Sequence, residues 1–144
     1  MNAMDGNPNE ATRTIAIRAE DIERFVALVG DRNPIHVDED YAAGTRFQRR
    51  IAPGMLVASY ISAVIANQLP GPGVIYLEQN LRFEAPVHIG DTITAKVRVV
   101  ERPRPDRLRL ETTCSNQSGQ RVLSGTALVQ VSPPVPAEAG TGPA

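Results

Sequence analysis

The 144-residue chain has few of the residues on which disulfide-bonded, zinc-binding and nucleic-acid-binding proteins depend. Its one cysteine, Cys114, cannot form an intramolecular disulfide, and no CxxC or Cys/His spacing typical of a zinc site accompanies it. The formal net charge of −1 gives no basic field that would attract nucleic acid. We therefore expect no metal, no cofactor and no nucleic-acid partner.

Neither a long apolar run nor a secretory signal can be read in the sequence. No stretch approaches the roughly 18 apolar residues that a membrane span requires, and the start MNAMDGNPNEATRT has neither a basic n-region nor an apolar h-region. We expect no membrane association and a cytoplasmic location. The length favours one domain, over residues 12–132. We expect disordered tails on either side, a polar one at 1–11 and a Pro/Ala/Gly-rich one at 133–144.

The first half of the domain shows helical periodicity after one short strand, RTIAIR at 13–18. Apolar residues then recur at spacings of three and four, which predicts a helix with one buried face: Ile22, Phe25, Val26 and Val29. Gly30 marks its expected end. Residues 38–47, DEDYAAGTRF, form a weaker helical stretch. In PGMLVASYISAVIANQL, residues 53–69, apolar residues surround most of the circumference, which predicts a buried helix beginning at Pro53.

The second half alternates apolar and polar residues with a period of two. Four such segments follow one another, at 74–83, 92–100, 107–113 and 121–131. Their short connections predict an antiparallel meander with one buried face. Because the chain offers one apolar helix and one apolar sheet face, we expect an α+β fold in which the sheet wraps around the helix.

A polar loop, GDRNPIHVD at residues 30–38, follows the first helix and contains one of only two histidines in the chain. Pro34 excludes the helical conformation at Asn33 and favours a tight turn, so Asp31 and His36 can converge on one point. Such a pair can activate a water molecule and move a proton. On spacing alone, a plain helix cap or Asx turn is the more common explanation. We interpret the other histidine, His88, as a solvated edge residue with no role.

Three segments and the sheet order together resemble the MaoC-like hotdog family: GDRNPIH, RRIAPGMLVAS and LPGPGVIYLEQNLRFEAPVHIGD. Within that family the chain is most similar to the single-domain (R)-specific enoyl-CoA hydratases that feed polyhydroxyalkanoate synthesis. The resemblance covers about residues 12–131. It implies a hotdog fold, a lyase that hydrates trans-2-enoyl-CoA to the (R)-3-hydroxyacyl thioester, and a homodimer whose sheets join edge to edge. Coenzyme A would then be part of the substrate, not a cofactor.

The family motif makes Asp31 and His36 the catalytic pair, with Asn33 bracing the loop. Gly54 is the expected oxyanion donor, because N–H groups in the first turn of a helix lack intrahelical acceptors and glycine has no side chain to block a thioester. Pro53 stands where such hydratases often carry a histidine. Any role of that histidine is lost, whereas the Gly54 N–H remains.

The buried helix holds further candidates. Ser62 matches a serine position in the hydratases, but it lies roughly 12 Å along the axis from Gly54 at 1.5 Å per residue. We expect it to support the loop or line the pocket, unless it simply bonds back to the preceding turn. Pro53, Met55, Leu56 and Ile65 are candidates for the substrate pocket, although apolar helix residues are more often core.

Arg49 and Arg50 are candidate contacts for the coenzyme A phosphates, although a solvated charge pair is the simpler interpretation.

Other functions stay open. A 3-hydroxyacyl-acyl-carrier-protein dehydratase would use the same pair in reverse. A hotdog thioesterase would carry a carboxylate on the central helix, and 53–69 contains no Asp or Glu. A non-catalytic acyl-thioester-binding protein would need neither Asp31 nor His36. For assembly, a sheet that wraps one helix leaves an open strand edge, which predicts a homodimer or a multiple of it.

Overall fold

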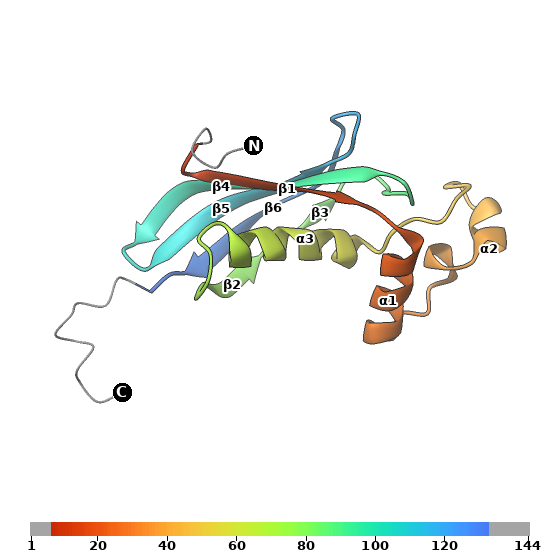
Figure 1. The fold of residues 1–144 in the computed structure, drawn as a ribbon, viewed down its shortest axis with the longest axis horizontal. Helices are drawn as coiled ribbons and strands as arrows, with labels where there is room; N and C mark the ends of the chain where they lie inside the picture. The colour runs from red at the N-terminus through yellow and green to blue at the C-terminus, as the bar shows by residue number, and fades with distance from the viewer. Residues whose placement is uncertain (1–6, 133–144) are drawn as a thin grey trace.

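The computed structural model describes residues 7–132 as a six-stranded antiparallel sheet that wraps around one long helix (Figure 1). This is the predicted α+β hotdog arrangement. In chain order the elements are β1 (Glu10–Ala16), α1 (Ala19–Val29), the 3-10 helix η2 (Pro34–His36), α2 (Glu39–Ala43), α3 (Gly54–Asn67), β2 (Ile75–Gln79), β3 (Arg82–Phe83), β4 (Thr92–Arg104), β5 (Arg107–Ser115) and β6 (Arg121–Gln130).

The boundaries of the domain differ slightly from the prediction. β1 begins at Glu10 and pairs with β4, so the last two residues of the expected N-terminal tail belong to the sheet. The predicted C-terminal tail, 133–144, and residues 1–6 of the N-terminal tail lie outside the described residues.

Helix α3 fills the concave side of the sheet, as its apolar circumference predicts. Its buried residues are Leu56, Val57, Ala58, Ile61, Val64 and Ile65. They face the buried side of the sheet. Along β4 and β5, every second side chain is buried on this side, and the side chains between them are more exposed. Each Å² of apolar surface removed from water contributes about 25 cal/mol to stability. The contact between α3 and the sheet is therefore the main stabilising feature of the fold.

The strand order is β1-β4-β5-β6-β2, with β3 also on β6, so the predicted meander is confirmed for β4, β5 and β6 and wrong for its first segment. The segment 74–83 crosses to the far edge instead of pairing with β4, and it is interrupted at Asn80. The Asn80 N–H donates to the Thr126 carbonyl at 3.0 Å, and Asn80 Oδ1 accepts a bond from the Thr126 N–H at 3.1 Å. Its carbonyl approaches Gly125 so closely that a Cβ at that position would collide with it.

Burial on this far edge also departs from the alternating pattern. The side chains of Ile75, Tyr76 and Leu77 are 55%, 38% and 40% exposed, so β2 has no buried face in the monomer. Strand β4 is longer than predicted, because the expected loop at 101–106 continues the strand through Pro103. The proline is tolerated there because the β4–β5 register is irregular between Glu101 and Arg104.

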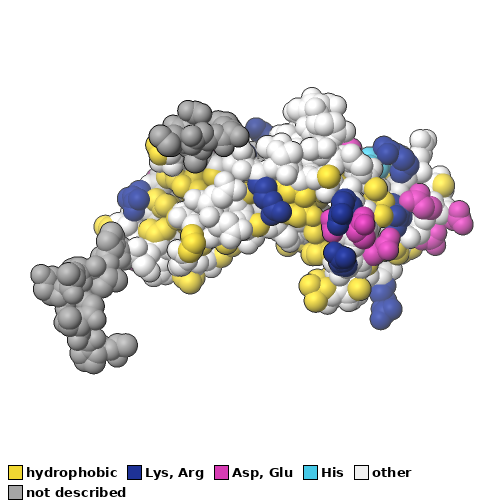
Figure 2. Space-filling view, viewed as in Figure 1, with side chains coloured by type: hydrophobic (Ala, Val, Ile, Leu, Met, Phe, Trp, Pro, Cys, Tyr) yellow, Lys and Arg dark blue, Asp and Glu magenta, His cyan; other side chains and the backbone are white. Residues whose placement is uncertain are grey.

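Helices α1 and α2 project beyond the end of the sheet (Figure 1). Acidic and basic side chains gather there on the face shown in Figure 2. Gly30 ends α1 with a φ of 78°, as predicted for a left-handed C-cap. The helix expected over 38–47 is shorter, because it begins after the Asp38 cap and ends at Ala43. We call residues 19–47, with these two helices and η2, the overhang.

Candidate active site

The loop after α1 folds by local side-chain hydrogen bonds. Asp31 Oδ1 accepts a bond from the Asn33 N–H at 2.9 Å, and Asn33 Oδ1 accepts one from the Ile35 N–H at 3.3 Å. Pro34 then begins the single turn of η2. These turns bring His36 back toward Asp31, so the two side chains converge as predicted, and Asn33 caps the turn between them.

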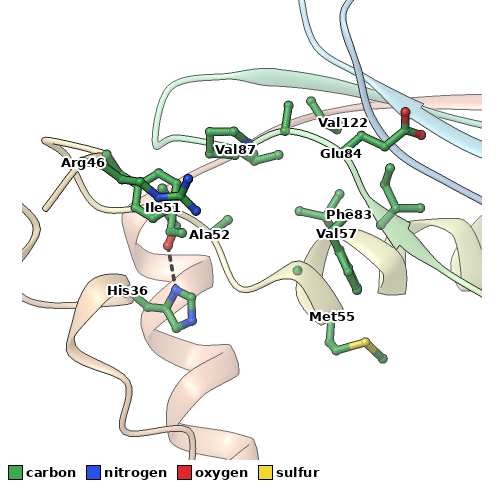
Figure 3. A pocket seen from close by; sticks show the side chains of 15 residues that line it. His36, Arg46, Ile51, Ala52, Met55, Val57, Phe83, Glu84, Val87 and Val122 are labelled. Carbon is green, nitrogen blue, oxygen red and sulfur yellow. Dashed lines mark hydrogen bonds between the residues drawn. The ribbon is translucent and has the colours of Figure 1, made fainter.

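His36 is held by a backbone carbonyl. Its Nδ1 lies 2.8 Å from the Ile51 oxygen (Figure 3), and the residue is 8% exposed. A carbonyl only accepts, so Nδ1 carries a proton, and in the tautomer with a single ring proton Nε2 is the acceptor. Nε2 lies 3.7 Å from Asp31 Oδ2. This distance exceeds a direct hydrogen bond, and both atoms are acceptors when Asp31 is ionised.

Gly54 is the first residue of α3, and Pro53 precedes the helix as its N-cap. The segment leading to it is tied on two sides. Ile51 N–H donates to the Ile35 carbonyl at 3.2 Å, and Ala52 N–H donates to the Val87 carbonyl at 2.7 Å. The start of α3 is thereby fixed next to the histidine turn.

Two cavities meet at this point, and His36, Gly54 and Met55 line both of them. The first, of about 510 Å³, continues along apolar side chains from α3, β3, the segment after β3, and β6: Val57, Phe83, Ala85, Val87, Val122 and Leu123. The second, of about 470 Å³, lies against α1 and is lined by Phe25, Val29, Asp31, Pro53 and Ser59. A molecule that spans both cavities would pass His36 and the start of α3.

Three α3 residues proposed for the site lie elsewhere. Leu56 and Ile65 are core residues, 7% and 1% exposed, and line neither cavity. Ser62 is half-buried and also lines neither. Sequence reasoning missed Ser59, which lies one turn after Met55 and faces the second cavity. Ser59 lies four residues after Met55 and therefore on the same face of the helix, which was the signal available in the sequence.

The structure gives Arg49 and Arg50 different surroundings. The Arg50 side chain is 11% exposed, donates to Glu39 at 2.6 Å and lies 3.6 Å from Glu23. It therefore connects α1 and α2 and lines neither cavity, and its contact with a coenzyme A phosphate stays an untested prediction. Arg49 is exposed and lines neither cavity. Arg46, which the sequence reasoning passed over, lines the first cavity and stacks 4.6 Å from the Phe47 ring centroid.

His88 is half-buried, not a solvated edge residue. Its Nδ1 lies 3.2 Å from the Arg50 carbonyl, and its backbone bridges to Ile51. It therefore helps to hold the segment before α3.

Two observations on the described residues concern metals and membranes. Within 7–132, no group of three or more His, Cys, Asp or Glu side chains could hold a metal ion. None of the helices in that range is long and apolar enough to cross a membrane.

Burial raises the pKa of the Cys114 thiol to about 12, so this cysteine is protonated at neutral pH.

A family model, described as a MaoC like domain, matches residues 2–122. The chain belongs to the MaoC-like family. It is 47% identical over 128 residues to an (R)-specific enoyl-CoA hydratase of Rhodospirillum rubrum, covering 88% of this chain and 87% of that protein. A 3-hydroxybutyryl-CoA dehydratase of Methylorubrum extorquens is 49% identical over 116 residues, or 80% and 73% of the two chains.

Among solved structures, the (R)-hydratase of Aeromonas caviae involved in PHA biosynthesis superposes with a TM-score of 0.83 at 39% identity, over 85% of this chain and 94% of that one. These relatives confirm the predicted family, the hotdog fold and the hydro-lyase class. The roles of the individual site residues stay predictions.

Proposed function

We propose that this MaoC-like protein adds water to trans-2-enoyl-CoA and forms the (R)-3-hydroxyacyl-CoA thioester. The observation that carries the proposal is the 3.7 Å separation of Asp31 Oδ2 and His36 Nε2, at the cavity that also exposes the start of α3. The substrate and the (R) configuration follow the names of the hydratase relatives.

A water molecule placed between the two acceptors would donate one hydrogen to each of them. Its remaining lone pair is then free to attack Cβ of the enoyl group. The proton that the water loses passes to the pair, and the pair returns a proton to Cα. Because the hydrogen bond to Ile51 keeps the proton on Nδ1, Nε2 is available as the base.

The Gly54 N–H would hold the thioester oxygen. As the first residue of α3, it has no intrahelical acceptor, and it lies at the positive end of the helix dipole. Negative charge develops on this oxygen as Cβ is attacked, so the donor stabilises the transition state more than the ground state. Since the pair and the helix start flank one cavity, water and proton reach the same face, which predicts syn addition.

The proposal is tested with purified protein and crotonyl-CoA or longer trans-2-enoyl-CoA thioesters, without added metal, nucleotide or flavin. We expect loss of enoyl-thioester absorbance and a product that an (S)-specific 3-hydroxyacyl-CoA dehydrogenase does not oxidise. Rapid oxidation would contradict the (R) assignment, and release of free coenzyme A would indicate a thioesterase. The same assay with acyl-carrier-protein thioesters separates the hydratase from the dehydratase alternative. Binding without turnover would favour a non-catalytic protein.

The exposed edge at β2 supports the proposed homodimer. An unpaired edge strand with apolar side chains is a template for pairing, whereas the other edge, β1, exposes Thr12, Arg13 and Thr14. We therefore place the pairing of the two sheets at β2. The variant Leu77→Lys should be monomeric by light scattering, with Val100→Lys on β4 as the control. If light scattering of the wild-type protein shows only a 15.5 kDa species, the homodimer proposal is contradicted.

The cytoplasmic location stays a prediction.

A further inference from the structure

Phe83 is a large apolar side chain that stays 54% exposed although it lies beside the start of α3. Figure 3 shows it on the same cavity as His36 and Met55. A Cβ built on Gly54 would lie 2.6 Å from Phe83 Cε1 and 2.7 Å from Cδ1, so the ring covers the Cα of Gly54. The residue at position 54 must therefore be glycine for this ring to stay where it is.

The backbone on this side of the cavity is fixed. Phe83 pairs with Leu123 of β6, and the next two N–H groups, of Glu84 and Ala85, both donate to the Val122 carbonyl. The pairing with β6 therefore sets the position from which the Phe83 ring projects toward Gly54.

Around the ring, the cavity wall is mostly apolar, with Arg46 and Glu84 among its polar lining residues. Val57, Val122 and Leu123 line it there, and they give no hydrogen-bond partner to the amides of pantetheine. They suit an acyl chain instead. If the Gly54 N–H holds the thioester oxygen, the acyl carbons begin directly beside the Phe83 ring.

We propose that Phe83 determines which acyl chains this site accepts, by limiting the apolar space next to the Gly54 N–H. This inference rests on the proposed hydratase function and adds a specificity residue to it. A smaller side chain opens the cavity toward Val57 and Leu123. Each methylene that enters contributes about 0.8 kcal/mol, or roughly fourfold in kcat/KM.

The test compares Phe83→Leu, Phe83→Ala and wild type on crotonyl-CoA and trans-2-octenoyl-CoA. We expect the octenoyl-to-crotonyl ratio of kcat/KM to rise about 15-fold in Phe83→Ala, as for two methylenes, and less in Phe83→Leu. Leu28→Ala is the matched control, because Leu28 is 85% exposed on α1 and lines neither cavity. Its ratio should equal that of wild type.

Two results would overturn the inference while the hydratase proposal stands. One is an equal loss of activity on both substrates in both variants. The other is conversion of Phe83→Ala to a monomer with an unchanged ratio, which would show that the ring is exposed in order to contact a second subunit. If the wild-type protein hydrates neither thioester, the proposed function fails and the specificity role fails with it.

Discussion

The overhang and the sheet-wrapped helix are stabilised in different ways. Helix α3 and the strands bury apolar side chains, and Ile61, Ile93 and Leu110 are no more than 1% exposed. In the overhang, Ile22 and Ala42 are fully buried, but the loop between the helices is shaped by hydrogen bonds that backbone N–H groups donate to the side chains of Asp31, Asn33 and Asp38. The proposed catalytic side chains sit in the polar region, and the proposed oxyanion donor begins the apolar helix. The proposed mechanism therefore requires the overhang and the start of α3 to keep their positions relative to each other.

The largest expected effect concerns the pair itself. Asp31→Asn and His36→Gln should each lower kcat by about 10²–10⁴-fold, because positioned acid–base groups contribute that much. Asn at position 31 keeps the oxygen that accepts from Asn33, so the turn should survive while the carboxylate is lost. Steady-state kinetics on the best enoyl thioester measures the loss.

Asp38→Asn is the control for this pair, because Asp38 caps α2 by the same kind of bond and lines neither cavity. Its kcat should stay near that of wild type. Losses of only two- or threefold in folded Asp31 and His36 variants would move the active site elsewhere.

A core substitution should separate stability from activity. Ile61→Ala removes a side chain that is 1% exposed, and we expect it to lower the free energy of unfolding by about 2–5 kcal/mol. Denaturant titration measures this, with Leu28→Ala expected to change it by less than about 0.5 kcal/mol. The kcat per folded molecule of Ile61→Ala should stay near wild type. A large fall in kcat would show that the core and the overhang are not separable.

Arg50 connects the overhang to the segment before α3, and its neighbour provides a matched control. Arg50→Met leaves Glu39 and Glu23 without this partner, so we expect faster amide exchange in α1 and α2 and a kcat lower by up to about tenfold. Arg49→Met removes the same charge from an exposed site and should change neither. A rise in KM in Arg49→Met, with kcat unchanged, would return that residue to the coenzyme A site.

The smallest effect lies at the start of α1 and depends on pH. The Arg18 side chain donates to Asp21 and lowers the pKa of that carboxyl below its usual 3.8. A lowered pKa in the folded state adds stability above the ordinary pKa, and this stability disappears as the pH falls through the folded value. Asp21→Asn should therefore lower Tm slightly at pH 7, and the difference should shrink below pH 3.8. A Tm difference that does not change with pH would contradict this.

How far the sequence predicts the structure differs between the two regions. Hydrophobic periods of 3.6 and 2 predicted α1, α3 and most strands, because these patterns depend on neighbouring residues. The Asp31–His36 convergence was also readable, since Pro34 and the Asx turns act within six residues. The place of β2 was not, because its partner β6 lies more than 40 residues further along the chain. Neither the break at Asn80 nor the close approach of Gly125 leaves a local signal.

The sequence by itself determined the polar turn that carries Asp31 and His36, the buried helix that begins beside Gly54, and the resemblance to the MaoC-like family. Only the tertiary structure decided which helix residues reach the cavity. Met55 and Ser59 face it, while Leu56 and Ile65 point into the core. The physical reason is that α3 is apolar nearly all round, so its composition does not show which side meets the sheet. That choice depends on long-range packing, as does the placement of Phe83 over Gly54 by β3.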